Sequence, residues 1–140
     1  MKKNNRKLYG YQTTNRAKHN LKVHLILVCK YRKKLLVRGV ETDTKNIIRG
    51  IESNSDFDII EMETDKDHIH LMIQYIPRVS ISAIVNRIKS ISTKRIWKIH
   101  QQFLQKHFWK EKTFWTDGYF VCSIGEANPE TIRNYIANQG

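Results

Sequence analysis

Two short patterns in different parts of the chain carry residue types that could form a catalytic site. The first is His68-Ile69-His70, in which two imidazoles flank one apolar residue. The second is Tyr135, followed four positions later by Gln139 close to the end of the sequence. Two neutral imidazoles and an amide oxygen can ligate a divalent cation. A cation beside a phosphodiester would polarise it for attack by the phenol of Tyr135.

Each pattern alone also has an ordinary structural interpretation. Two surface histidines on a half-exposed strand would produce the first, because the pattern is short. A tyrosine that packs a terminal helix, with a polar residue near its end, would produce the second. Their combination favours phosphoryl transfer, which needs a metal clamp, a nucleophile and a cationic groove.

A strand must position the two histidines. Side chains two residues apart on a strand share a face, so His68 and His70 lie beside Met72 and Gln74. The alternate residues from 69 to 75 form a uniformly apolar opposite face, which must pack against helices. We therefore predict that both imidazoles project from a helix-free face of a sheet. Tyr135 and Gln139 are one turn apart and share a face of a final helix.

The hydrophobic pattern along the chain predicts the order β-α-β-β-α-β followed by one more helix. Two-residue alternation and turn residues predict strands over residues 20–30, 57–64, 68–75 and 118–124. Helical spacing predicts helices over residues 40–54 and 81–104 and from Pro129 onwards. This is an α+β, ferredoxin-like fold, in which the two long helices cover one face of an antiparallel sheet and the other face is open.

The composition indicates a single domain with a polyanionic partner. The 140 residues carry a formal net charge of +12, for which nucleic acid is the usual explanation, although a ribosomal or membrane-surface protein would look similar. We interpret residues 1–18 as a basic flexible arm and 19–140 as one domain. Cys29 and Cys122 are far apart and resemble buried apolar residues. Without a signal peptide or an apolar run of ~20 residues, we expect a cytoplasmic, nucleoid-associated protein that makes no membrane contact.

Candidate DNA-binding residues group on the long helix and in the loop after the first strand. They are Lys30, Arg32, Lys33, Arg87, Lys94, Arg95 and Lys98. Further lysines lie among the aromatic residues of segment 108–115. Cations interleaved with aromatic rings suit single-stranded nucleic acid, because cations pair with phosphates and rings stack on bases. The alternative, that the rings belong to the core and the charges are only solvated, stays open. We interpret the remaining histidines as structural or surface residues: His19, His24, His100 and His107.

From about residue 19 to its end, the chain resembles the single-tyrosine HUH transposases of the smallest bacterial insertion sequences, the TnpA type. HUH denotes His-hydrophobe-His. The resemblance is carried in order by His24–Lys34, Glu61–His70, Trp115–Phe120 and Tyr135–Gln139. It implies cleavage and rejoining of single-stranded DNA at hairpin-bearing element ends through a 5′-phosphotyrosine intermediate.

The resemblance also implies roles for individual residues. Tyr135 would be the nucleophile, and His68, His70 and Gln139 would ligate Mg²⁺ or Mn²⁺. The protein would be a homodimer in which the tyrosine helix can serve the partner's histidine pair. The sequence leaves open whether Tyr135 acts in cis or in trans.

Other functions remain as alternatives. A non-catalytic single-stranded nucleic-acid-binding module with an RRM-like fold would share the element order, but such modules stack bases on aromatics of the sheet face, where this chain has His68 and His70. Replication initiators and relaxases of the HUH superfamily are usually longer. A domesticated HUH nuclease acting on chromosomal palindromes is also compatible with the sequence.

Overall fold

The computed structural model describes residues 10–14 and 17–140, and its centre is a four-stranded antiparallel sheet. The strands are β3 (Leu21–Val28), β4 (Phe57–Thr64), β5 (His68–Tyr75) and β6 (Phe120–Ser123). Their order across the sheet is β4-β5-β3-β6. In chain order this is 2-3-1-4, the order of a ferredoxin-like sheet, which confirms the predicted fold class.

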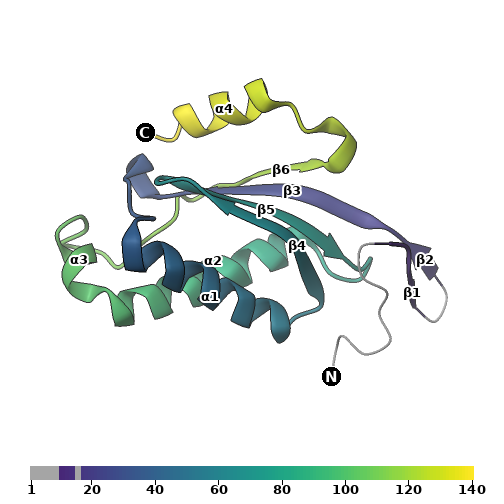
Figure 1. Ribbon diagram of the computed structural model, residues 1–140, viewed down its shortest axis with the longest axis horizontal. Helices are drawn as coiled ribbons and strands as arrows, with labels where there is room; N and C mark the ends of the chain where they lie inside the picture. Colours follow the sequence, from purple (N-terminus) through teal and green to yellow (C-terminus); the bar gives the residue numbers. More distant parts are fainter. Residues whose placement is uncertain (1–9, 15–16) are drawn as a thin grey trace.

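Helices cover both faces of this sheet (Figure 1). On one face lie α1 (Arg38–Ser53), α2 (Ile81–Ile99) and the short α3 (Gln101–Gln105). On the opposite face lies α4 (Pro129–Ala137), which follows β6 and a short 3-10 turn, η2 (Ile124–Glu126). A second 3-10 turn, η1 (Lys30–Arg32), follows β3.

The main core lies between the sheet and the pair α1 and α2. The residues predicted to face the helices are buried there, among them Leu25 and Leu27 of β3 and Ile69, Leu71 and Ile73 of β5. The apolar stripes of the two helices close the core with Ile48, Ile51, Ile84 and Ile88. The predicted hairpin turn also forms, with the backbone N–H of Asp65 donating to the carbonyl of His68 at 3.0 Å.

The predicted long helix over residues 81–104 is wrong at one point. The chain leaves helical geometry at His100, which has φ −116° and ψ 36°, so that α2 and α3 are separate helices. The imidazole Nε2 of His100 lies 2.7 Å from a carboxylate oxygen of Asp43 on α1. The apolar spacing continues through Phe103 and Leu104, so periodicity alone could not reveal the break.

The N-terminal segment contains a hairpin that the sequence analysis missed. Strands β1 (Gln12–Thr14) and β2 (Ala17–His19) pair antiparallel as a separate two-stranded sheet. The flexible arm over residues 1–18 stays a prediction: residues 12–14 and 17–19 pair as these two strands, and residues 1–9 and 15–16 lie outside the described part. Within the described ranges, no helix has the length and hydrophobicity needed to cross a membrane.

Candidate metal and tyrosine site

Helix α4 covers part of the sheet face that we predicted to be open. Its Ile136 is buried against Ile26 and Val28 of β3, and Phe120 and Tyr135 pack around this second apolar cluster. Ile26 pairs with His70 across the sheet, and Val28 pairs with His68, so residues directly opposite each other share this face. The prediction of a helix-free face is thus wrong, and α4 brings Tyr135 to the side of the sheet that carries both histidines.

His68 is held by a carboxylate from the preceding turn. Its Nδ1 lies 2.8 Å from Oδ1 of Asp67, whose Oδ2 accepts a hydrogen bond of 3.0 Å from Nε of Arg32. Burial acts to raise the pKa of Asp67, but the hydrogen bonds from His68 and Arg32 outweigh it and lower that pKa below its ordinary value. An ionised Asp67 accepts the Nδ1 proton of His68, which leaves Nε2 as the lone-pair nitrogen that a metal requires.

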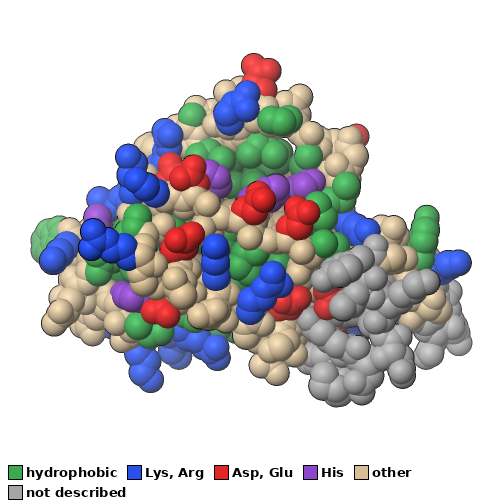
Figure 2. All heavy atoms as spheres, viewed as in Figure 1, with side chains coloured by type: hydrophobic (Ala, Val, Ile, Leu, Met, Phe, Trp, Pro, Cys, Tyr) green, Lys and Arg blue, Asp and Glu red, His purple; other side chains and the backbone are tan. Residues whose placement is uncertain are grey.

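His70 contacts His24, which we interpreted from the sequence as a structural or surface residue. Its Nε2 lies 2.7 Å from Nδ1 of His24 on β3. Burial, and then the neighbouring His24, lower the pKa of His70, which favours the neutral ring that metals bind. Glu61 and Glu63 of β4 add an exposed acidic border, since Glu63 pairs directly with His70. Figure 2 shows a row of histidine side chains below α4 with acidic groups next to them.

Tyr135 is half-buried at the edge of the second cluster. Its ring centre lies 5.6 Å from that of Phe120, and its phenol oxygen lies 3.6 Å from the position that a Cβ atom of Gly118 would occupy. Burial raises the pKa of the Tyr135 phenol, and the nearby Thr116 hydroxyl acts less strongly in the opposite direction. The phenol is therefore protonated at neutral pH and must lose its proton to act as a nucleophile.

The start of α4 agrees with the sequence prediction. The side chain of Asn128 accepts hydrogen bonds from the backbone N–H groups of Glu130 and Thr131, at 2.9 and 3.2 Å, and Pro129 occupies the first turn. This cap fixes where the helix begins, and so places Tyr135 near its last turn.

Gln139 lies beyond the end of α4, so the prediction that it shares a helix with Tyr135 is wrong. Its side-chain Nε2 donates to the backbone carbonyl of Tyr135 at 3.2 Å, which leaves its amide oxygen as the ligand-type atom. The following Gly140 lies against the side chain of Arg32, the residue that binds Asp67. The chain end therefore reaches the end of β5 that carries His68.

The side chains of this region can be compared with the ligands that a divalent cation needs. Over residues 10–14 and 17–140, no group of three His, Cys, Asp or Glu residues is arranged to hold a metal. A cation between His68 and His70 would therefore depend on the amide oxygen of Gln139 and on water. A set of two nitrogens with oxygen ligands fits an octahedral ion, and imidazole favours Mn²⁺ over the harder Mg²⁺.

A basic groove of about 930 Å³ runs between α2 and residues 112–117. Its lining includes four lysines, namely Lys89, Lys94, Lys98 and Lys112. Sequence reasoning missed Lys89, whose ammonium donates to the backbone carbonyls of Thr116 and Gly118, both at 2.6 Å. Gly118, which does not line the cavity, also lies close to the phenol of Tyr135.

Only some of the basic residues predicted to bind DNA on α2 line this groove. Lys94 and Lys98 line the cavity, whereas Arg87 does not, since its Nε donates to the hydroxyl of Ser55 at 2.7 Å. Arg95 is exposed but does not line the cavity either. Arg87 therefore lies outside this cavity, and its role in DNA binding stays a prediction.

The loop after β3 forms a patch of cations and aromatic rings. Nζ of Lys30 lies 5.6 Å from the ring centre of Tyr31, and Nζ of Lys33 lies 5.9 Å from that of Phe108. The two tryptophans nearby differ: Trp109 is 81% exposed, whereas Trp115 is 4% exposed and belongs to the core. The alternative that the aromatics of this segment are core residues is thus correct for Trp115 and wrong for Trp109.

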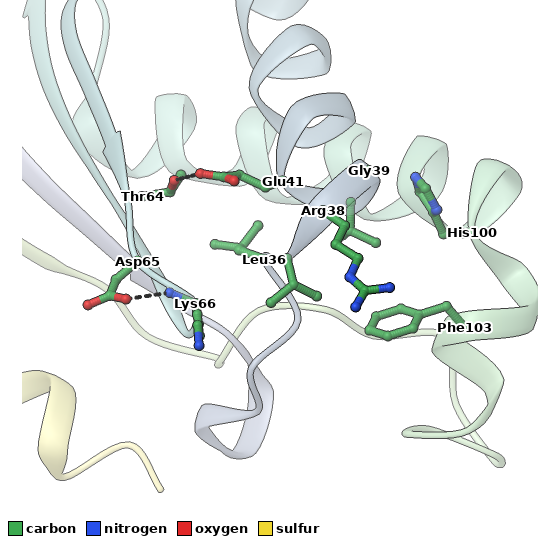
Figure 3. A pocket seen from close by; sticks show the side chains of 11 residues that line it. Leu36, Arg38, Gly39, Glu41, Thr64, Asp65, Lys66, His100 and Phe103 are labelled. Carbon is green, nitrogen blue, oxygen red and sulfur yellow. Dashed lines mark hydrogen bonds between the residues drawn. The ribbon is translucent and has the colours of Figure 1, made fainter.

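A separate cavity of about 830 Å³ lies on the helical side of the sheet (Figure 3). It is lined by the start of α1, the turn between β4 and β5, and two residues beyond α2, His100 and Phe103. Glu41 closes one side by accepting a hydrogen bond from Thr64. None of the predicted site residues lines this cavity.

Comparison with known proteins identifies the family of this chain. Residues 17–139 match the family described as transposase, IS200 like, so the chain belongs to that family. The chain is 31% identical over 121 residues to the ISDra2 transposase TnpA of Deinococcus radiodurans, covering 86% of this chain and 85% of the relative. It is 28% identical to the transposase of the element IS200 from Salmonella typhimurium, with 86% and 77% covered.

Solved structures agree on the fold. A crystal structure of a transposase candidate from Deinococcus radiodurans R1 has a TM-score of 0.84 at 27% identity, covering 91% of this chain and 97% of that one. A REP-associated tyrosine transposase bound to a REP hairpin has a TM-score of 0.52 at 14% identity, covering 89% and 68%, which shows a likeness of fold only.

Proposed function

We propose that this IS200-like transposase cleaves and rejoins single-stranded DNA at hairpin-bearing insertion-sequence ends, with Tyr135 as the nucleophile and a divalent cation as cofactor. The observation that supports this most directly is the position of α4. It packs through Ile136 onto the strand next to β5, and so brings Tyr135 to the face that carries His68 and His70.

The proposed reaction is a transesterification. The phenol oxygen of Tyr135 forms a bond to the scissile phosphorus while the bond from phosphorus to the 3′ oxygen breaks. The DNA 5′ end is then held as a phosphotyrosine. The phenolic proton is transferred to the released 3′ oxygen, which becomes a 3′-OH. Attack of a 3′-OH on this linkage reverses the step and joins strands, so no nucleotide cofactor is needed.

His68, His70 and the amide oxygen of Gln139 would hold Mg²⁺ or Mn²⁺. The cation would act as a Lewis acid on a non-bridging oxygen of the scissile phosphate. Asp67 prepares His68 for this role, since it engages Nδ1 and so directs the Nε2 lone pair outwards. The rigid strand fixes the separation of the two imidazoles.

The basic groove supports single-stranded DNA as the partner. Its lysines can pair with successive phosphates, and one of them, Lys89, also donates to the carbonyl of Gly118, the residue next to the phenol of Tyr135. We further propose, from the family resemblance, a cytoplasmic homodimer acting on nucleoid DNA. In this structure, which contains one chain, α4 packs on its own sheet.

The decisive experiment is a denaturing gel. The protein is mixed with end-labelled single-stranded DNA carrying a hairpin from its own locus, with Mg²⁺ or Mn²⁺. A slow, heat-stable protein–DNA band that EDTA abolishes is the expected result. Tight binding in a native gel without any covalent band would instead favour the non-catalytic binding module. Cleavage of chromosomal palindromes but not of element ends would favour the domesticated nuclease.

Charge reversal in the basic groove should weaken DNA binding. For Lys94→Glu or Lys98→Glu we expect roughly a tenfold lower affinity and a salt-dependence slope smaller by ~0.7, the value for one lost phosphate contact on a single strand. The measurement is fluorescence anisotropy over a series of salt concentrations. Arg95→Glu is the matched control, because it makes the same charge change on the same helix outside the cavity. Equal losses in all three variants would contradict a specific path along this groove.

A further inference from the structure

His24 makes a specific contact that the proposed reaction does not use. Its Nδ1 lies 2.7 Å from Nε2 of His70, and the ring centres are 4.9 Å apart with the planes at 42°. A hydrogen bond between two neutral imidazoles requires one ring to donate and the other to accept. The tautomer of His70 is therefore linked to that of His24.

The fold explains why these two rings meet. His24 pairs with Met72 across the β3–β5 ladder, and Ile26 pairs with His70, so His24 is the diagonal neighbour of His70 on the same face. Diagonal neighbours in a sheet are within reach of long or aromatic side chains. Ile26 packs with Ile136 of α4, so His70 has a packed apolar residue directly opposite it on β3 and His24 as its diagonal neighbour.

The arrangement repeats at both histidines of the pair. His68 has its Nδ1 engaged by Asp67, and His70 has its Nε2 engaged by His24. A histidine that ligates a metal commonly donates its second ring N–H to a neighbouring acceptor, which fixes the ring and its lone pair. Here Asp67 is the acceptor for one histidine and His24 can be the acceptor for the other.

We propose that His24 is a positioning residue of the metal site. It accepts the Nε2 proton of His70 on its own Nδ1 and so presents Nδ1 of His70 to the cation. This inference rests on the proposed function, because it requires His68 and His70 to be ligands. It assigns to His24 no contact with DNA or with the reacting atoms.

The test is Mn²⁺ binding by the full chain without DNA, measured from the electron paramagnetic resonance signal of free Mn²⁺. For His24→Ala we expect Mn²⁺ affinity to fall by roughly 10–100-fold, the usual effect of removing such a partner. His24→Asn should recover most of the affinity, because its amide oxygen can take the place of Nδ1. Met72→Leu is the packing control, since it changes the residue opposite His24 but leaves both imidazoles, and it should bind Mn²⁺ like the wild type.

Nitrogen-15 NMR of the histidine rings in the metal-free protein gives an independent readout. The wild type and His24→Asn should show His70 as the Nε2–H tautomer, whereas His24→Ala should show a mixture. Unchanged Mn²⁺ affinity in His24→Ala would overturn the inference, as would an equal loss in His24→Asn with an unchanged His70 tautomer. If the wild type binds Mn²⁺ no better than His68→Ala does, the metal site of the proposed function itself fails. If only His68→Ala loses affinity, the metal site stands and the role of His24 is excluded.

Discussion

Tyr135→Phe should abolish the covalent protein–DNA band and strand cleavage, while DNA affinity stays within about twofold of the wild type. The substitution removes one oxygen atom and keeps the ring that packs against Phe120 and the Ile136 cluster. Helix α4 should therefore keep its position on the sheet. The measurement is a denaturing gel for the adduct, beside anisotropy for binding.

Tyr119 provides the control for this experiment. It is also half-buried and lies next to Gly118, but its ring packs against the main core on the other side of the sheet. Tyr119→Phe should form the adduct at a normal rate. An adduct that persists in Tyr135→Phe and disappears in Tyr119→Phe would show that Tyr119, and not Tyr135, is the nucleophile.

The parts of this molecule that the sequence predicted are those set by short-range geometry. The alternation from His68 to Tyr75 requires both histidines to share a face, and the structure places them so. The Asp65–Asp67 turn and the Asn128 cap are likewise local, since each depends on side chains within a few residues of the backbone they bind. The order of strands follows from this list of elements and the ferredoxin-like plan.

The parts that were missed depend on contacts between distant segments. His24 and His70 are 46 residues apart in the chain, and their contact follows only from the exact register of β3 and β5. Lys89 joins the groove because α2 lies beside residues 116–118, which no local pattern encodes. The position of α4 did have a signal: Ile26 and Val28 are apolar residues on the second face of β3, and they need a covering element.

The break after α2 shows the same limit. Residues 81–104 have continuous helical spacing, yet the chain turns at His100, whose ring contacts Asp43 of α1. This contact joins α2 to α1 and is independent of the apolar pattern of either helix. The boundary could therefore be predicted only with the packing of α1 against α2 in hand.

His68→Ala should lower the rate of adduct formation by about a hundredfold or more, with little change in DNA affinity. Loss of about 3 kcal/mol of metal-derived stabilisation of the transition state corresponds to that factor. The measurement is the single-turnover rate of adduct formation at saturating DNA as the Mn²⁺ concentration is raised.

Asp67→Asn tests the orientation of His68 separately from its role as a metal ligand. The amide keeps a group next to Nδ1 of His68 but removes the carboxylate that accepts its proton and pairs with Arg32. It should therefore raise the Mn²⁺ concentration needed for half-maximal rate by roughly tenfold, with a near-normal rate at saturation. His68→Ala should instead remain slow at every Mn²⁺ concentration, because a ligand is absent. A His68→Ala protein that cleaves at the wild-type rate would remove the metal role from β5, and Tyr135 would then need another source of activation.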